Sequence, residues 1–152
     1  ERAMAHIQRW DEKGEGESVA AITTEMRNLM DQYCGVFRTQ EILDEGLQKM
    51  RALYSRLGEV KLGDQSRVFN TSRLEAFELE NQLEVAIATM LSASARRESR
   101  GAHSRLDYAD RNDREWMKHT LYFSRDGGVL DYKPVRTQPL SVESFPPIER
   151  VY

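Results

Sequence analysis

The chain has 152 residues, of which 39% are hydrophobic and 31% are charged, and its formal net charge is −3. This length is sufficient for one domain with a buried core. The net charge excludes a chain-wide basic field that would hold nucleic acid. No apolar run approaches the roughly 20 residues that cross a bilayer, and no secretory leader begins the chain. We therefore expect a soluble, intracellular protein with no nucleic-acid partner and no direct membrane insertion.

The first segments indicate a helical protein. Residues 1–10 are typical of the end of a helix, and a polar, Gly-containing connection follows. Because the chain starts inside this helix without an initiator Met, we expect it to be a piece of a longer protein. Ser18 is a suitable N-cap for a second helix. That helix carries an apolar stripe at helical spacing, formed by Ile22, Met26, Leu29, Met30 and Tyr33.

The single cysteine, Cys34, lies at the end of this apolar stretch. One cysteine cannot form an internal disulfide, which fits a reducing compartment. Its apolar surroundings predict a small buried hydrophobe rather than a nucleophile.

A third helix is predicted after Gly35. Thr39 can cap it, and Glu41 in its first turn faces the positive end of the helix dipole. Its apolar stripe is strong, and Gly58 is placed just past its expected end. The stripe consists of Leu43, Leu47, Met50, Leu53, Tyr54 and Leu57.

The next helix is predicted to be the longest. The connector 59–70 precedes it, with a short extended piece expected at Val68 and Phe69. Residues 72–75, SRLE, have the form of a capping box, and the helix is expected to continue to about Ser99. Apolar residues lie around more than one side of this segment, which predicts the central helix of a bundle.

The remainder of the chain differs in character. Residues 100–115 are charged, and two apolar runs flank the loop SRDGG at residues 124–128, which predicts a β-hairpin. Pro134 stops the second strand or places it on an edge, and the tail with three further prolines is expected to be extended. The predicted fold is mainly α. Residues 1–99 form the helical bundle, and residues 100–152 form a charged loop, a hairpin and a tail that pack on it as one domain.

Few residues here carry chemistry by themselves. GEGESV at residues 14–19 resembles a dinucleotide loop only superficially, because it lacks the third glycine, follows no strand and carries two carboxylates. None of the histidines, at positions 6, 103 and 119, has a metal-ligand spacing. No serine lies in a G-x-S-x-G elbow. We therefore expect no metal site.

One cluster of Arg, His, Asp and Gly follows the long helix, at residues 96–113. Cations there complement the negative helix end, and Gly101 suits a C-terminal cap. Three interpretations remain open. The cluster is a solvated, self-paired charge run, an ion-paired loop that docks against another domain, or an anion site built on Arg100, His103 and Arg105. Alternating signs argue against the third, since Glu98, Asp107 and Asp110 would compensate the arginines.

The same cluster carries a resemblance to a known family. RESRGAH at residues 97–103 resembles the R-x-S-R-G-x-H stretch of the succinate dehydrogenase and fumarate reductase flavoproteins, and L-aspartate oxidase has a related stretch. Further matches follow the family's order. They are VFRT (36–39), VFNT (68–71), WMKHTL (116–121), LDYKPV (130–135) and PPIERVY (146–152).

The details of the match favour the dehydrogenase within this family. L-aspartate oxidase is disfavoured because its chain stops soon after the R-G-x-H stretch. The DYKPV run and the lack of an extension past Tyr152 favour succinate dehydrogenase of the bacterial type over fumarate reductase. The family usually has Pro at the position of Ala109 and Asp at the position of Asn112, which affects the expected rigidity of the loop.

The resemblance implies a three-helix, spectrin-like bundle followed by a small hairpin, packed on the FAD-binding domain of the same chain. It implies a parent subunit that oxidises succinate to fumarate with covalent FAD. Electrons then pass to an iron–sulfur subunit and to quinone, beside membrane anchor subunits on the cytoplasmic side of the bacterial inner membrane. The family's FAD-linking and substrate-binding residues lie upstream, so this chain is expected to hold no catalytic or cofactor-binding residue and to be inactive alone.

The docking interpretation names specific residues of the charged loop and predicts that the loop and the tail are exposed in this chain, with the loop poorly ordered. The alternatives are a fumarate reductase domain, a free-standing helical adaptor that binds a partner through the same loop, and a small enzyme with a pocket at His103 or His119. The expected docking residues are Arg97, Arg100, Gly101, His103, Arg105, Asp107, Arg111, Asp113 and His119.

Overall fold

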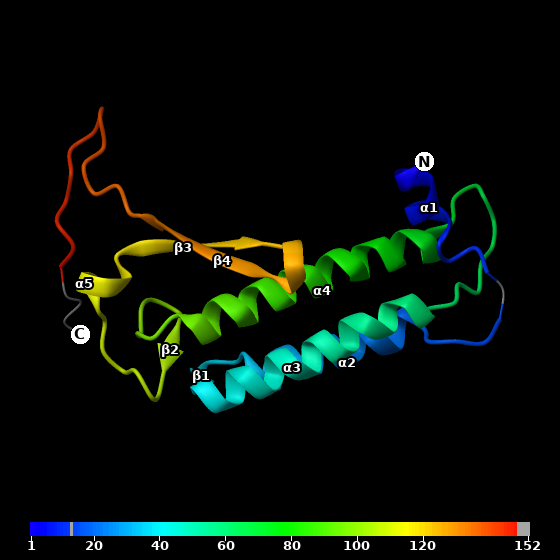
Figure 1. The fold of residues 1–152 in the computed structure, drawn as a ribbon, viewed down its shortest axis with the longest axis horizontal. Helices are drawn as coiled ribbons and strands as arrows, with labels where there is room; N and C mark the ends of the chain where they lie inside the picture. Colours follow the sequence, from blue (N-terminus) through cyan, green and yellow to red (C-terminus); the bar gives the residue numbers. More distant parts are fainter. Residues whose placement is uncertain (13, 149–152) are drawn as a thin grey trace.

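A computed structural model describes residues 1–12 and 14–148 of the chain, and its three long helices form a bundle (Figure 1). These helices are α2 (Val19–Tyr33), α3 (Gln40–Arg56) and α4 (Thr71–Ala95). Each of them packs against the other two. The short α1 (Arg2–Gln8) lies beside the beginning of α4. The prediction of a mainly α fold with a three-helix bundle is therefore confirmed.

Short polar side chains begin all three helices. Ser18 accepts a hydrogen bond from the Ala21 amide at 3.1 Å, so its predicted cap is confirmed, as is that of Thr39 at the start of α3. The capping box expected at residues 72–75 is wrong. Asn70 caps α4 instead, because its side-chain oxygen accepts from the Arg73 amide at 2.8 Å while its amide group binds two carbonyls of the connector.

The core lies where the three helices meet. Gly46 permits the closest approach of α2 and α3, since a Cβ at this position would lie 2.2 Å from the Cβ of Tyr33. Cys34 is buried as predicted, and burial raises the pKa of its thiol, although the nearby Arg38 lowers it. The largest fully buried apolar side chains are Trp10, Ile22, Leu43, Met50, Leu53, Leu79, Leu83 and Met90.

The connector between α3 and α4 differs from the prediction at two places. Gly58 does not follow the helix end directly but lies inside a 3₁₀ turn, η1 (Leu57–Glu59). The extended piece expected at Val68 and Phe69 is absent from this described segment. Phe69 instead has a left-handed φ of +54° and is 95% exposed, because the bonds of Asn70 to the backbone of the connector fold these residues into a compact turn.

The long helix ends earlier than expected, at Ala95 instead of about Ser99. The chain then makes a tight turn in which the amides and carbonyls of Arg100 and His103 bond each other. Gly101 lies in this turn with φ +59°, so it is a turn glycine and not the predicted helix cap. The turn leads into β2 (Ser104–Arg105), which pairs in parallel with β1 (Phe37–Arg38).

The C-terminal third contains the predicted hairpin. After α5 (Asp113–Trp116), strand β3 (Lys118–Phe123) pairs antiparallel with β4 (Val129–Pro134), and η2 (Arg125–Gly127) forms the loop. The hairpin runs along the second half of α4 (Figure 1). Pro134 ends the second strand, as expected. The tail 135–148 has neither helix nor strand, and the end of the PPIERVY motif, residues 149–152, lies outside the described residues.

None of the helices that the structure describes combines the length and the apolar character that a bilayer crossing requires.

Candidate functional site

The charged cluster is organised around Glu98, which is 0% exposed. Its carboxylate accepts hydrogen bonds from Arg100 at 2.8 and 2.9 Å, from the Asn112 amide at 2.8 Å, and from Arg96. Burial alone would raise the pKa of this carboxyl, but the hydrogen bonds, led by those of Arg100, outweigh it and lower the pKa. Glu98 is therefore an ionised, fully satisfied group inside the loop.

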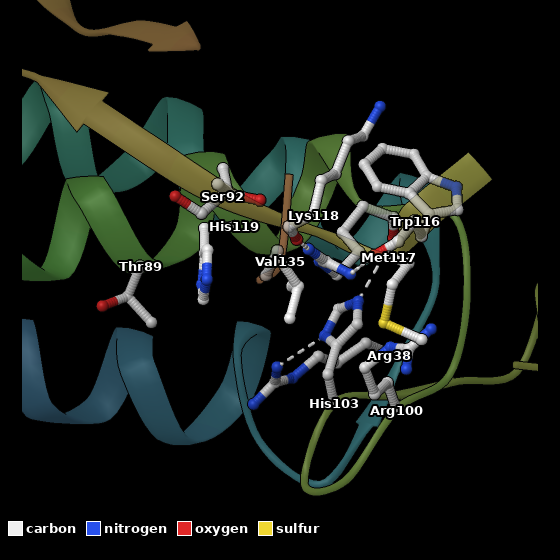
Figure 2. Close-up of a pocket in the computed structure, with 13 residues that line it drawn as sticks. Arg38, Thr89, Ser92, Arg100, His103, Trp116, Met117, Lys118, His119 and Val135 are labelled. Atoms are coloured by element: carbon white, nitrogen blue, oxygen red, sulfur yellow. Dashed lines mark hydrogen bonds between the residues drawn. The ribbon is translucent and has the colours of Figure 1, made fainter. Parts of the chain in front are cut away.

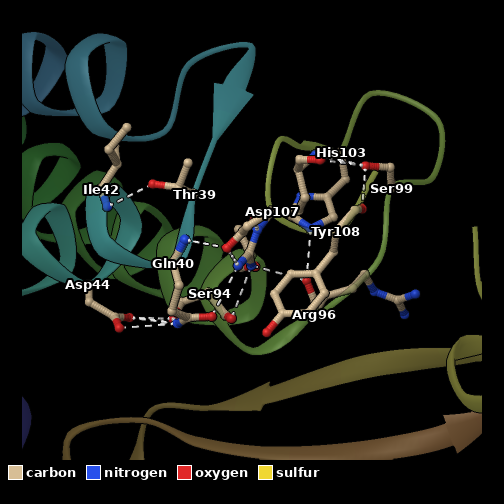
Figure 3. A network of polar contacts seen from close by, with 12 residues as sticks. Thr39, Gln40, Ile42, Asp44, Ser94, Arg96, Ser99, His103, Asp107 and Tyr108 are labelled. Carbon is tan, nitrogen blue, oxygen red and sulfur yellow. Dashed lines mark hydrogen bonds and ion pairs between the residues drawn. The ribbon is translucent and has the colours of Figure 1, made fainter. Parts of the chain in front are cut away.

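Arg105 forms the second centre and is 1% exposed. Its partners Gln40, Ser94 and Asp107 lie close together in Figure 3. Its guanidinium donates to Asp107 through two bonds of 2.7 Å and to the Gln40 side chain at 3.1 Å. The same group donates to three backbone carbonyls at the end of α4, those of Ala93, Ser94 and Arg96. These carbonyls have no partner within the helix, so Arg105 acts as a buried C-terminal cap.

Asp107 connects this cap to the start of α3. It accepts from the Gln40 backbone amide at 2.8 Å as well as from Arg105. The bonds from Arg105, followed by the Gln40 amide, lower the pKa of the Asp107 carboxyl to about 2 against the cost of its burial. The end of α4 and the start of α3 are thus held by one ion pair.

A further pair of charges lies at the outer side of the loop. Asp113 accepts from Arg100 at 2.6 Å and from Arg111 at 2.9 Å. Arg111 also donates to the carbonyl of Ile148 at 3.1 Å, which ties the tail to the loop. The loop is exposed at residues 101–102 and 106–111, as expected, but it is folded around an interior of ion pairs in which Glu98 and Arg105 are buried, which was not expected.

A pocket of about 540 Å³ opens beside this network, between α4, the β1–β2 end and β3 (Figure 2). His103 lies in its wall and accepts from Arg38 Nη1 through Nδ1 at 2.9 Å, so its other nitrogen carries the proton and donates to the Arg96 carbonyl at 3.2 Å. Burial, together with the charges of Arg38, Arg105 and Arg96, lowers the pKa of His103. The imidazole is therefore neutral near pH 7.

The structure places the nine predicted residues unequally. It brings most of them into the ion-paired loop at one end of the bundle. His119 is exposed and lines the pocket from β3, and Arg97 is exposed outside the network of described hydrogen bonds. The predicted compensation by Glu98 and Asp107 is present, while Asp110 contributes its backbone carbonyl to the Ser99 amide.

The sequence reasoning missed the residues that reach this cluster from distant segments. Arg38 comes from β1 and Gln40 from the start of α3, more than 60 positions earlier than their partners His103 and Arg105. Ser94 donates to Asp44 at 2.6 Å and accepts from Gln40. The one signal for Arg38 was its place in the VFRT motif, and nothing in the sequence marked Gln40 or Ser94.

The GEGESV stretch does not have the geometry of a dinucleotide loop. In the GEGESV stretch, a Cβ on Gly16 would lie 2.4 Å from the Glu59 carbonyl, so this glycine serves close packing against another backbone segment. Glu17 beside it binds Arg56 at 2.9 Å. A pyrophosphate has neither the space nor the charge it needs there. Within residues 1–12 and 14–148, no group of His, Cys, Asp and Glu side chains is arranged to hold a metal ion.

Comparisons with known proteins agree with this architecture. A family model described as "Fumarate reductase flavoprotein C-term" matches residues 23–152. The succinate dehydrogenase flavoprotein subunit of Coxiella burnetii is 46% identical over 148 residues, which are 97% of this chain and 25% of that protein. The fumarate reductase flavoprotein subunit of Escherichia coli is 40% identical over 141 residues, which are 90% of this chain and 23% of that protein.

A solved structure gives the same result. The structure of Escherichia coli quinol fumarate reductase superposes with a TM-score of 0.88 at 37% identity, and the match covers 99% of this chain and 26% of that one. The fold is thus that of a C-terminal helical domain of a flavoprotein oxidoreductase. The chain belongs to the succinate dehydrogenase and fumarate reductase flavoprotein family, of which it is the C-terminal domain. It spans about a quarter of the length of these relatives.

Proposed function

We propose that this domain is a scaffold and docking element of a succinate dehydrogenase flavoprotein subunit. The parent subunit oxidises succinate to fumarate with a covalently held FAD. It passes the electrons to an iron–sulfur subunit and to quinone, in a complex with membrane anchor subunits at the cytoplasmic face of the inner membrane. The bundle (1–99) and the loop, hairpin and tail (100–152) act together as one domain, which packs on the FAD-binding domain and carries no catalytic residue.

The observation that carries the scaffold role is that the charged side chains of the cluster at residues 96–113 make their hydrogen bonds within the domain. The Glu98 carboxylate and the Arg105 guanidinium are buried, and their hydrogen bonds end on the loop and on helix termini. Groups bound in this way stabilise a local structure and are not available to a substrate. The cluster therefore holds the loop in shape and does not turn over dicarboxylates.

The docking role is supported by exposed apolar side chains in the tail. Leu140, Val142, Phe145 and Ile148 are between 68% and 90% exposed. Four large apolar groups on a short extended segment are typical of a surface that another protein part covers. Among the predicted docking residues, Arg97 and His119 are exposed and remain available, whereas Arg105 acts inside the domain.

Succinate oxidation is favoured over fumarate reduction by the relatives' identities. The dehydrogenase subunit of Coxiella burnetii is 46% identical to this chain and that of Rickettsia bellii is 48% identical, against 40% for the fumarate reductase subunit of Escherichia coli. The two activities share a flavin and a substrate pair, so the direction is set by residues and partners outside this domain.

A direct test compares the 152-residue chain with the full-length subunit. Succinate-dependent dye reduction and a visible absorbance scan are measured on both proteins. We expect a colourless, inactive chain beside a yellow, active parent. Flavin absorbance or succinate turnover in the 152-residue chain would refute the scaffold role and direct attention to His103 and His119.

A further inference from the structure

We propose that the pocket between α4, the β1–β2 end and β3 binds a small oxyanion, a carboxylate or a phosphate, through Arg38 and His119, with the His103 ring holding Arg38 in place. This inference goes beyond the scaffold role, which assigns no ligand to the domain, and it does not depend on that role. It also differs from an anion site at Arg100 and Arg105, because these two residues bind the loop's own carboxylates.

The charge of the pocket lining supports an anionic ligand. None of the thirteen lining residues is Asp or Glu, while six of them are Arg, Lys or His. The positive charges of Arg96 and Arg100 are compensated by the carboxylates of Glu98 and Asp113. The Lys118 ammonium lies 4.5 Å from the centre of the Trp116 ring and turns toward that ring (Figure 2).

Arg38 is a cation of the lining that pairs with no carboxylate of the described residues. Its guanidinium donates to the carbonyls of Gly35 and Cys34 at 2.8 and 3.1 Å and to the His103 ring at 2.9 Å. All three of these acceptors are neutral groups. An arginine that is half-buried and fixed by neutral groups retains a full positive charge toward the pocket, and an oxyanion is its strongest complement.

A hydroxyl group adds a neutral donor to the pocket lining. Ser92 of α4 lines the pocket and lies next to His119 (Figure 2). A serine hydroxyl can donate a hydrogen bond to a carboxylate or phosphate oxygen.

The size and position of the pocket fit a small molecule. Its volume of about 540 Å³ lies within the roughly 300–1,000 Å³ typical of ligand sites. His119 closes the pocket on the side of α4, while Arg38 and His103 close it on the side of the β1–β2 end (Figure 2). An oxyanion bound by Arg38 and His119 would lie near both imidazole rings, which makes the two histidines natural reporters.

The test is an NMR titration of the histidine side chains in the 152-residue chain. Sodium succinate and sodium phosphate are added separately at constant ionic strength, with sodium chloride as the reference salt. We expect saturable shifts of the His103 and His119 signals with at least one of the two anions. His6, which lies beside the first half of α4 and pairs with Glu80 at 3.1 Å, serves as the internal control and should stay unchanged.

Variants separate binding from general charge effects. Arg38→Gln should weaken the oxyanion about tenfold, since a charge-assisted hydrogen bond is lost. Arg125→Gln, at an exposed arginine of the hairpin loop, removes the same charge far from the pocket and should leave the affinity unchanged. His119→Ala is the second variant, because His119 is exposed and its loss should weaken binding without lowering the melting temperature.

The titration also has a pH readout. A bound oxyanion offsets the charges of Arg38, Arg96 and Arg105, so the pKa of His103 should rise on binding in the wild type. Saturation by succinate alone identifies a carboxylate ligand, and saturation by phosphate alone identifies a phosphate ligand. Shifts that stay linear in concentration, that chloride reproduces, or that persist in both Arg38→Gln and His119→Ala would overturn the proposal.

Discussion

Replacing Glu98 by Gln tests whether buried ion pairs hold the loop. The substitution keeps the shape of the side chain and removes its charge. The carboxylate of Glu98 binds Arg96, Arg100 and the Asn112 amide, so the neutral amide leaves Arg96 without its compensating charge and leaves Arg100 with Asp113 alone. The new amide group also presents a donor to neighbours that are themselves donors.

The expected cost follows from the exposure of the partners. Breaking a fully buried ion pair costs about 3–5 kcal/mol. The side chains of Arg96 and Arg100 remain 15% and 30% exposed, so water recovers part of this loss. We therefore expect the free energy of unfolding to fall by about 2–4 kcal/mol. For a domain of this size the melting temperature should fall by roughly 5–15 °C.

The assay is urea and thermal unfolding followed by circular dichroism at neutral pH. The matched control is Glu78→Gln, which removes the same charge from an exposed position of α4 and should change the stability by less than about 0.5 kcal/mol. If Glu98→Gln unfolded at the same urea concentration as this control, the ion pairs would not be what holds the loop.

Three further changes test other parts of the structure. Asp107→Asn should make the free energy of unfolding depend less on pH in acid. The Asp107 pKa is lowered from 3.8 to about 2, so the stabilisation by its carboxylate is present above pH 4 and is lost toward pH 2. In a pH series of urea melts, the difference in stability between wild type and Asp107→Asn should therefore shrink from pH 4 to pH 2. Gly46→Ala forces a Cβ against Tyr33 and should lower the free energy of unfolding by about 1–3 kcal/mol in urea melts. Gly63→Ala, with open space around it, should leave the free energy of unfolding unchanged. Leu83→Asp places a charge at a 0% exposed position and should abolish the helical circular dichroism signal at 25 °C, since an unpaired buried charge costs several kcal/mol, roughly.

The bundle was predictable because its signals are local. The apolar stripes of α2 and α3 repeat within single helices, and Ser18 and Thr39 begin those helices with side chains that bind amides three positions later. The hairpin is local as well, since SRDGG connects its strands directly. Such features need no knowledge of which segments meet in space.

The polar end of the molecule was less predictable because its partners are distant. Parallel pairing of β1 with β2 joins segments 67 positions apart, and this pairing places Arg38 beside His103. The burial of Arg105 also depends on the carbonyls exposed where α4 ends, and that end at Ala95 was expected four residues later. An arginine that caps a helix from within the core has the same sequence appearance as a solvated one.

The ordered loop changes how docking would take place. A poorly ordered loop would have to fold on its partner and lose conformational entropy in doing so. The loop around Glu98 and Arg105 is already folded, so Arg97 and His119 are presented on a preformed surface and that cost is absent. The extended tail has several apolar groups left to bury, with Leu140 90% exposed. Ordering on contact with the rest of the flavoprotein is therefore expected in the tail, while the loop should dock as a rigid body.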